Sequence, residues 1–354
     1  TTATTTAMGA GCGKGGHQGS AEELAQCNEI ERFLRESKRK MKQEIKILIL
    51  GAGDSGKTTI CKQFQMINNE FTAENRLYFK TIIQASVVDY MKTLLRATDA
   101  LGRTVQRADL AARLLEGSSS LTPAVADTIA TLWEDPAVKD VYAQRNQIYI
   151  LPDCSAYLFG EVKRLAEENF VPTEDDCLRA RIRTTGIIEY NLNVNNILFK
   201  ILDVGGQRNE RRKWLHCFED VKCLLYCAAL DDYNLSLVED LNVNRMKEAV
   251  KLFNDVVSLP VLAAVPIIFF FNKSDLLKEK IERVTPEVVY PDYQGGHSYE
   301  EAAKFIQHVY MRLLPEGRTI YPHVTCALDR KNIKFVWDAV RHMVTSDTMK
   351  GMGM

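Results

Sequence analysis

The sequence GAGDSGKT at residues 51–58 constrains this chain more than any other feature, because it fits the pattern G-x-x-x-x-G-K-[ST]. Apolar residues within 44–50 predict a buried strand before it, and a helix is expected after it. Glycines at these places let backbone N–H groups turn inward around phosphate oxygens, and the helix start adds positive potential. A glycine-rich helix start without this role would not require Lys57 and Thr58 after the last glycine. We therefore expect Lys57 to reach nucleotide β- and γ-phosphates and the Thr58 hydroxyl to ligate Mg²⁺.

Strands and helices alternate along most of the chain. After Arg181, apolar stretches predict strands at 187–194, 197–203, 221–229, 266–271 and 319–325. The pattern differs between 71 and 179, where helical periodicity covers 77–101, 124–133 and 154–169 and no convincing strand is found. This alternation implies an α/β fold with a doubly wound, mostly parallel sheet, interrupted by an all-helical block. We expect a flexible segment at 1–20, a helix at 21–43, an α/β domain at 44–70 and 180–354 that ends in a C-terminal helix, and an inserted helical domain at 71–179.

Composition narrows the class of protein further. The 354 residues are 46% hydrophobic and 26% charged, which excludes a largely disordered chain. A formal net charge of −1 gives no bulk attraction to nucleic acid, so no nucleic-acid partner is expected. Nine cysteines without a C-x-x-C pair indicate free thiols in a reducing compartment. The longest apolar run, at 259–271, contains two prolines and is too short to cross a bilayer, and no secretory signal pattern is found. We expect a cytosolic globular protein.

A second motif, NKSD at residues 272–275, follows the apolar strand expected at 266–271. It therefore lies at the carboxyl end of a strand, where doubly wound sheets bind ligands. Asp275 can accept hydrogen bonds from both the ring N–H and the exocyclic amino group of guanine, whereas adenine has no amino group in the matching place. Alone the motif is weak, because polar turns after strands are common. Together with the phosphate loop it favours a guanine nucleotide over ATP.

Two further segments carry groups suited to phosphoryl transfer. In DVGGQ, residues 203–207, Asp203 can hold Mg²⁺ through water, the Gly-Gly pair can offer a backbone N–H to a γ-phosphate, and Gln207 can orient an attacking water. A tight turn with an incidental glutamine is the alternative. In RIRTTGI, residues 181–187, an arginine can spread the charge of a transferred phosphoryl group, and the Thr184 hydroxyl could complete the Mg²⁺ shell. Without the other motifs, these basic residues would be interpreted as a solvated face.

Taken in order, GAGDSGKTT, LRARIRTTGI, DVGGQRNERRKWLHCFE, NKSD and TCA resemble the alpha subunits of heterotrimeric G proteins. The resemblance extends from about residue 21 to residue 338 and includes the helical block. It implies a Ras-like P-loop GTPase domain, a helical domain that closes over the nucleotide, and GTP or GDP bound with Mg²⁺. It also implies a molecular switch that hydrolyses GTP to GDP and phosphate, for which about 10⁻² s⁻¹ is the general rate of this family.

The resemblance also implies roles for single residues. Arg181 would be the arginine finger, Gln207 the water-orienting glutamine, and Thr58 and Thr184 the Mg²⁺ ligands. Guanine would be held by Asn272, Lys273 and Asp275 and by the Ala327 backbone, and Asp153 would approach from the helical domain beside Leu178 and Arg179. The residues expected to contact the nucleotide are Gly51, Ala52, Gly53, Asp54, Ser55, Gly56, Lys57, Thr58, Thr59, Asp153, Leu178, Arg179, Ala180, Arg181, Ile182, Arg183, Thr184, Asp203, Val204, Gly205, Gly206, Gln207, Asn272, Lys273, Ser274, Asp275 and Ala327.

Protein partners are implied as well. In the GDP state, a beta-gamma dimer would bind the N-terminal helix and the second switch around Lys213, Trp214 and Phe218. We expect an exposed Trp214 to anchor that interface, and a purely core aromatic is the alternative. A G-protein-coupled receptor, an effector in the GTP state and a regulator of G-protein signalling complete the expected set.

Membrane attachment is expected through the N-terminus. Met8 and Gly9 followed by Cys12 resemble a myristoylation and palmitoylation start, although Gly13 stands where serine or threonine is typical. Two lipids anchor a protein stably where one is marginal. This predicts a peripheral location at the cytoplasmic face of the plasma membrane.

The sequence departs from the family pattern at several places. Asp54 stands where glutamate is usual and Cys154 where serine is usual, and 258–265 lacks the expected aromatic pair. Residues 349–354 contain two glycines and no leucine, unlike the leucine-rich tip that enters a receptor, so receptor coupling stays open. Two other interpretations also stay open. One is a divergent nucleotide-binding scaffold whose partner contacts matter more than hydrolysis, and the other is a different phosphate-loop enzyme, an ATPase or small-molecule kinase.

Overall fold

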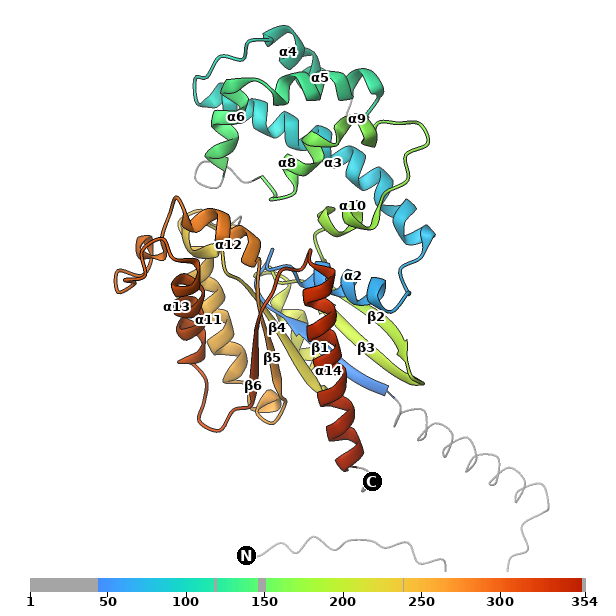
Figure 1. Cartoon of the computed structure of the whole chain (residues 1–354), viewed down its shortest axis with the longest axis vertical. Helices are drawn as coiled ribbons and strands as arrows, with labels where there is room; N and C mark the ends of the chain where they lie inside the picture. Colours follow the sequence, from blue (N-terminus) through green and yellow to red (C-terminus); the bar gives the residue numbers. More distant parts are fainter. Residues whose placement is uncertain (1–43, 118–119, 146–150, 238, 352–354) are drawn as a thin grey trace, which may run out of the picture. The chain divides into compact units, whose positions relative to one another are not determined.

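The computed structural model describes residues 44–117, 120–145, 151–237 and 239–351 (Figure 1). Apart from Glu44, these all belong to one structural unit, residues 45–354. The flexible segment and helix expected at 1–20 and 21–43, including Gly9 and Cys12, lie outside the described residues.

A six-stranded sheet forms the α/β part, in the order β2-β3-β1-β4-β5-β6. β1 pairs with β4, β4 with β5 and β5 with β6 in parallel, whereas β2 runs antiparallel to β3. This arrangement confirms the α/β fold with a mostly parallel sheet that the sequence predicts. From β1 to β6, the strands span Glu44–Leu50, Ile187–Val194, Ile197–Val204, Cys223–Ala229, Ile267–Asn272 and Ile320–Val324.

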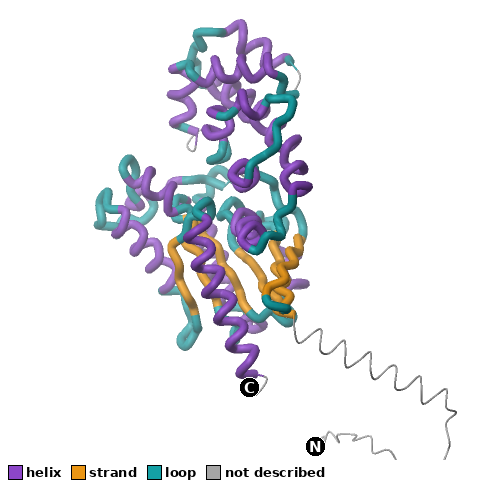
Figure 2. Tube along the Cα trace, turned by 45° about the vertical axis from the view of Figure 1, so that its right-hand side comes forward, coloured by secondary structure: helices purple, strands orange, loops and turns teal. Residues whose placement is uncertain are grey.

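Helices cover both faces of this sheet (Figures 1 and 2). The α-helices of this part are α2 (Lys57–Ile67), α11 (Arg245–Val257), α12 (Ser274–Ile281), α13 (Tyr299–Met311) and α14 (Arg330–Gly351). Short 3-10 turns are η1 (Arg211–Cys217), η2 (Asp232–Asn234), η3 (Pro260–Leu262) and η4 (Pro286–Val288).

Burial on both faces explains why the strands are apolar throughout. Successive side chains of a strand point to opposite faces, so β1 contributes to two cores. Leu48 and Leu50 pack in the core with α11 and α13, and Ile47 and Ile49 pack in the core with α2 and α14. The carboxyl ends of the parallel strands are thereby fixed at one edge of the sheet, where the predicted motifs follow them.

The block between β1 and β2 is helical. Its helices are α3 (Ala73–Ala100), α4 (Ala108–Glu116), α5 (Pro123–Trp133), α6 (Pro136–Ala143), α8 (Ser155–Gly160), α9 (Val162–Leu165) and α10 (Glu174–Arg179). Thr72 and Asn75 form a reciprocal capping box that begins α3. Ile83, Leu94 and Ile129 lie fully buried in a core of this block. Among its described residues no strand occurs.

The helix expected over 154–169 is wrong, because two short helices cover this stretch. α8 ends at Gly160, and Glu161 has a backbone conformation outside the helical region before α9 begins at Val162. Glycine is a poor helix former, which favours an interruption at this place. Apolar periodicity alone does not detect such a break.

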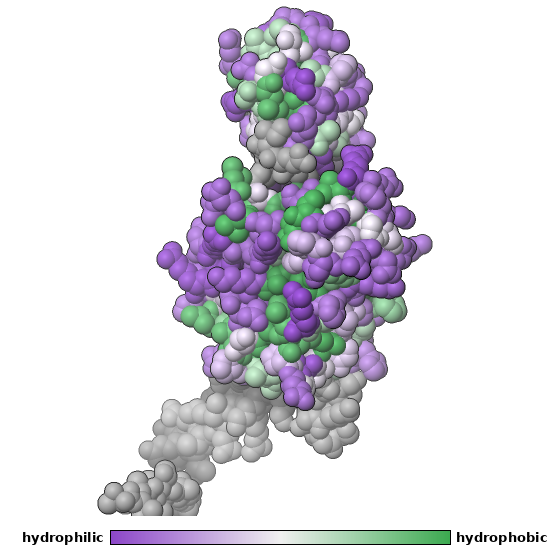
Figure 3. Space-filling model, turned by 90° about the vertical axis from the view of Figure 1, so that its left-hand side faces the viewer, coloured by the Kyte–Doolittle hydropathy of each residue, from purple (hydrophilic) through white to green (hydrophobic). Residues whose placement is uncertain are grey.

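Hydrophobic residues are concentrated inside these cores, and most of the surface seen in Figure 3 is hydrophilic, with a strip of hydrophobic residues in the α/β part. Among the described residues, none of the helices combines the length and the hydropathy that crossing a membrane requires.

Candidate functional site

The phosphate loop between β1 and α2 needs glycine at two positions. Gly51 and Gly56 have φ angles of 144° and 100°, which side chains rarely adopt. A Cβ atom on Gly51 would lie 2.1 Å from the Cys227 carbonyl oxygen, and one on Gly56 would lie 2.2 Å from Nδ2 of Asn272. The loop therefore packs against the ends of β4 and β5, and its glycines are required by this close approach.

Lys57, the first residue of α2, is directed back into the loop. Its Nζ donates to the carbonyl oxygens of Gly51 at 3.0 Å and Ala52 at 2.7 Å. The side chain is only 6% exposed, and burial lowers the pKa of Lys57 while Asp203 opposes the shift. A Cβ atom on Gly206 would lie 2.4 Å from this Nζ, so the DVGGQ segment also borders the loop. A cation held among carbonyl oxygens can exchange these acceptors for phosphate oxygens.

Three oxygen donors from separate segments meet beside Lys57. Oγ1 of Thr58 lies 2.8 Å from Oγ1 of Thr184 and donates to Oδ2 of Asp203 at 2.6 Å. Asp203 is fully buried, which raises the pKa of its carboxyl, and its Oδ1 has no hydrogen-bond partner among the described residues. Two hydroxyls and a carboxylate are hard donors that fit Mg²⁺.

A cage made only of protein ligands is not formed here. Within the described ranges, no group of three or more His, Cys, Asp or Glu side chains could hold a metal ion. Mg²⁺ usually takes few ligands from a protein and the rest from phosphate and water. The donor set around Thr58 is suited to that mode of binding.

The predicted catalytic residues lie against the same loop. Nη2 of Arg181 donates to Oδ2 of Asp54 at 2.7 Å. A Cβ atom on Gly53 would lie 3.3 Å from Cγ of Gln207, so this glutamine packs on the loop. Its Oε1 is buried and, among the described residues, accepts no hydrogen bond. The structure thus brings a guanidinium and an amide to one phosphate loop from segments more than 120 positions away in the chain.

The NKSD segment follows β5, and its first residue connects two loops by hydrogen bonds. Nδ2 of Asn272 donates to the carbonyl oxygen of Ser55 at 2.8 Å, and its Oδ1 accepts from the Ala327 backbone N–H at 2.9 Å. Asn272 therefore joins the phosphate loop to the TCA loop. The Ser274 N–H donates to the Thr325 carbonyl oxygen at 3.1 Å, and the half-buried Asp275 follows it at the start of α12.

Asp153 reaches this segment from the helical block. Nζ of Lys273 donates to Oδ2 of Asp153 at 2.7 Å. Burial alone would raise the pKa of Asp153, but the Lys273 ammonium holds it well below its usual range. Of the neighbouring predicted residues, Leu178 is buried, whereas the Arg179 guanidinium pairs with Asp175 and lies over the Tyr157 ring.

The expectation of an exposed Trp214 is wrong. Trp214 in η1 is only 4% exposed, and its Nε1 donates to the Gly205 carbonyl oxygen at 2.9 Å. Leu215 beside it is 68% exposed instead. The indole buries more apolar area than any other side chain, and the core beneath η1 receives it with its N–H satisfied. The core alternative, which the sequence left open, describes Trp214 correctly.

Sequence reasoning missed several charged residues that support the site. Glu248 of α11 accepts from both Arg208 and Arg211, which follow Gln207. Arg245 lies 3.0 Å from Asp232 and 3.9 Å from Asp54, so it lies between η2 and the phosphate loop. No local motif marks these residues, because the partners come together only through the packing of α11.

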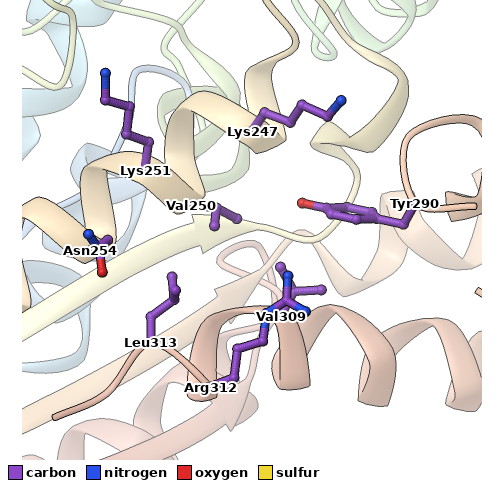
Figure 4. A pocket seen from close by; sticks show the side chains of 8 residues that line it. All are labelled: Lys247, Val250, Lys251, Asn254, Tyr290, Val309, Arg312 and Leu313. Atoms are coloured by element: carbon purple, nitrogen blue, oxygen red, sulfur yellow. The ribbon is translucent and has the colours of Figure 1, made fainter. Parts of the chain in front are cut away.

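A cavity of about 330 Å³ lies elsewhere, between α11 and α13 (Figure 4). The Tyr290 hydroxyl points toward Val250, and Arg312, the residue after α13, also lines this space. None of its lining residues belongs to the predicted site, so this cavity is separate from the phosphate loop. The lining residues are Lys247, Val250, Lys251, Asn254, Tyr290, Val309, Arg312 and Leu313.

Comparison with known proteins agrees with this geometry. The sequence model of the G-protein alpha-subunit family matches residues 25–344. The chain is 40% identical over 336 residues to the guanine nucleotide-binding protein alpha-4 subunit of Dictyostelium discoideum, covering 93% of this chain and 97% of the relative. It is 38% identical over 335 residues to the alpha-9 subunit of the same organism, covering 94% and 98%.

Proposed function

The chain belongs to the family of G-protein alpha subunits, and on this premise we propose that it is a switch that binds GTP and GDP with Mg²⁺ and hydrolyses GTP slowly. Members of this family are GTPases that bind guanine nucleotides, generally with Mg²⁺. The observation that carries the proposal is the convergence of Arg181 and Gln207 on the loop that holds Lys57. Neither a phosphate-binding scaffold nor a guanine-binding module requires those two groups there.

Each group has a chemical part in the proposed reaction. Lys57 and the backbone N–H groups of the loop bind the β- and γ-phosphates of GTP. Thr58 and Thr184 would hold Mg²⁺, which would neutralise charge on the phosphate oxygens. Gln207 orients the attacking water, and Arg181 stabilises the charge that spreads over the transferred phosphoryl group.

Hydrolysis would release two segments of the chain. With GTP bound, residues 181–184 and 206–214 would be held by contacts to the γ-phosphate, so loss of that phosphate would free them. The output is therefore a change of protein partner. Family members generally act with a beta-gamma dimer, a receptor and an effector.

We extend these partners to this chain, with a regulator of G-protein signalling and a site at the cytoplasmic face of the plasma membrane. Because Trp214 is buried, the exposed Leu215 replaces it as the apolar anchor expected in the second switch.

Nucleotide selectivity and hydrolysis together test the proposal. GDP with Mg²⁺ should raise the Tm of the protein, and ADP should not, because only a ligand that binds the folded state stabilises it. Competition should favour GTP over ATP by about 10⁴-fold or more. In single-turnover assays, Gln207→Leu and Arg181→Cys should slow hydrolysis strongly, Arg181→Cys by about 20- to 30-fold, while GTP still binds.

Gln307→Leu, at a half-buried position of α13 that lies outside the predicted site, is the matched control and should hydrolyse GTP normally. A protein that binds GTP but does not hydrolyse it would be a nucleotide-binding scaffold. A preference for ATP would indicate a different phosphate-loop enzyme, and unchanged hydrolysis in both variants would overturn the roles of Arg181 and Gln207.

A further inference from the structure

Lys62 of α2 is a buried cation that the proposed reaction does not use. Its side chain is 4% exposed, and its Nζ donates to the carbonyl oxygens of Cys177 at 2.8 Å and Ala180 at 2.9 Å. The same Nζ lies 4.4 Å from the centre of the Phe79 ring. Among the described residues no carboxylate forms an ion pair with it. Figure 1 shows α10, which provides the first carbonyl, beside α2.

Burying an ammonium group without a counter-ion is costly. Burial lowers the pKa of Lys62 to about 8, although the Cys177 thiol and other nearby acids oppose the shift. A methionine of similar length could fill this space without that desolvation cost. We therefore attribute the presence of a charge at this position to its hydrogen bonds with the two carbonyl oxygens, and not to the packing of α2 alone.

The first of these oxygens belongs to the last turn of α10, and the second belongs to Ala180, which directly follows the helix. The helix ends at Arg179, and the last backbone bond runs from the Ala180 N–H to the Asp176 carbonyl oxygen. The Cys177 carbonyl would bond to residue 181 only if the helix continued, so it lacks a partner within the helix. A cation at a helix C-terminus also interacts favourably with the helix dipole. Lys62 thus fixes the point at which the chain leaves α10 and becomes extended.

We propose that Lys62 is a positioning residue that holds the backbone directly before Arg181, so that the guanidinium is presented to the phosphate loop. Asp54 holds the other end of the same residue, through its 2.7 Å bond to Nη2. Asp54 belongs to the phosphate loop and Lys62 to the helix that continues from it. Arg181 is therefore clamped at its backbone and at its side chain by one continuous segment. This inference rests on the proposed function.

The size of the effect has an upper limit. Replacing Lys62 cannot slow GTP hydrolysis more than removing the arginine that it positions. General rates of GTPases with and without an arginine in cis differ by about 20- to 30-fold, a value that comes from this family and its relatives. Small displacements of a catalytic group can lower a reaction rate by up to about 10²-fold. We therefore expect that replacing Lys62 can lower the rate of hydrolysis by a large part of this range of about 20- to 30-fold.

Single-turnover GTP hydrolysis by full-length Lys62→Met tests the proposal. The rate constant should fall about tenfold, with affinity for a non-hydrolysable GTP analogue within about threefold of the unmodified protein. Lys92→Met is the matched control, because Lys92 is also buried and donates to one carbonyl oxygen, that of Gly117, inside the helical block. It should leave the rate unchanged. If Lys62→Met does not fold, Lys62→Gln replaces it.

A double-mutant cycle separates positioning from general damage. In an Arg181→Cys background, Lys62→Met should cause no further loss, because the group it positions is already absent. An equal loss in both backgrounds, or no loss in either, would overturn the proposal.

Hydrogen exchange gives a readout that does not depend on hydrolysis. Amides of residues 178–184 should exchange faster in Lys62→Met and normally in Lys92→Met. If the unmodified protein does not hydrolyse GTP, the proposed function fails, and exchange still decides whether Lys62 holds this segment. Unchanged exchange in Lys62→Met would reject the inference by itself.

Discussion

Asp54 connects the phosphate loop to the segment that carries Arg181, and its length departs from the family pattern. Burial alone would raise the pKa of Asp54, but Arg181, Arg245 and Lys273 hold that pKa below its ordinary value. Despite being one methylene shorter than glutamate, Asp54 still reaches Arg181 at 2.7 Å. A single carboxylate therefore orients the guanidinium in the arrangement that the structure shows.

Removing that charge should slow hydrolysis. We expect Asp54→Asn to lower the single-turnover rate constant by about fivefold or more, because Arg181 loses its charged partner. Asp54→Glu should keep most of the activity, since a glutamate is usual at this place. Asp109→Asn, which breaks an exposed pair with Arg107, is the control and should have no effect. Full activity in Asp54→Asn would show that this contact does not orient Arg181.

Asp176 is a second carboxylate whose surroundings set its pKa and its contribution to stability. It is fully buried and accepts hydrogen bonds from Arg164, Tyr157 and the Thr173 N–H. Burial would raise the pKa of Asp176, but these donors lower it from 3.8 to about 2. Asp176→Asn should reduce the free energy of unfolding by about 2 kcal/mol at pH 7.

The pH dependence of that difference follows from the direction of the shift. Because the pKa in the folded state is depressed, the stabilisation is fully present above about pH 4 and is lost as pH falls toward 2. Urea unfolding at pH 7 and near pH 3 should therefore give a smaller difference at the lower pH. Asp175→Asn, in an exposed pair with Arg179, should change little at either pH. A difference that grows in acid would contradict this account.

At the scale of elements, α14 shows how one helix can have a buried and an exposed face. Trp337 is fully buried, with its ring centre 4.5 Å from that of Phe64 in α2 and 5.4 Å from that of Phe199 in β3. Phe335, two residues earlier on the same helix, is 70% exposed. Position on the helix, and not residue type, decides which aromatic ring joins the core.

The two rings form a matched pair for a stability test. Trp337→Ala should lower the free energy of unfolding by about 3–5 kcal/mol, because it leaves a cavity between α14, α2 and β3. Phe335→Ala should change it by less than about 0.5 kcal/mol. Urea unfolding of both variants measures the difference. Similar losses in both would mean that α14 does not pack as the structure describes.

At the scale of the whole molecule, two ion pairs between described residues join the helical block to the α/β part. The side chains of Lys273 and Asp153 are 15% and 34% exposed, whereas those of Arg330 and Glu174, which pair at 2.8 Å, are 49% and 46% exposed. Exposed pairs contribute little, so the pair at the site should matter more for closure over a nucleotide.

Release of GDP distinguishes these pairs. Asp153→Asn should accelerate dissociation of a fluorescent GDP analogue about tenfold, which corresponds to ~1.4 kcal/mol. Glu174→Gln should remain within about twofold of the unmodified protein. Equal release rates for Asp153→Asn and the unmodified protein would show that this contact does not help to retain the nucleotide.

The fold class and the segments expected to form the site can be predicted from the sequence. Contiguous motifs such as 51–58 and 272–275 encode local backbone geometry, and burial of both sheet faces leaves a continuous apolar strand before each of them. Both effects involve residues that are close together in the sequence, so sequence patterns can predict them. The family comparison supports the fold and the switch at its general level, whereas the roles of single residues stay predictions.

The contacts between distant side chains depend on tertiary packing and cannot be predicted from the sequence. Trp214 is in a core that no local pattern reveals, Arg245 lies between η2 and the phosphate loop, and Lys62 contacts carbonyl oxygens more than 110 positions away. Each of these depends on the packing of one element on another. The physical reason is that burial and electrostatic pairing depend on distance in space, which the order of residues does not specify.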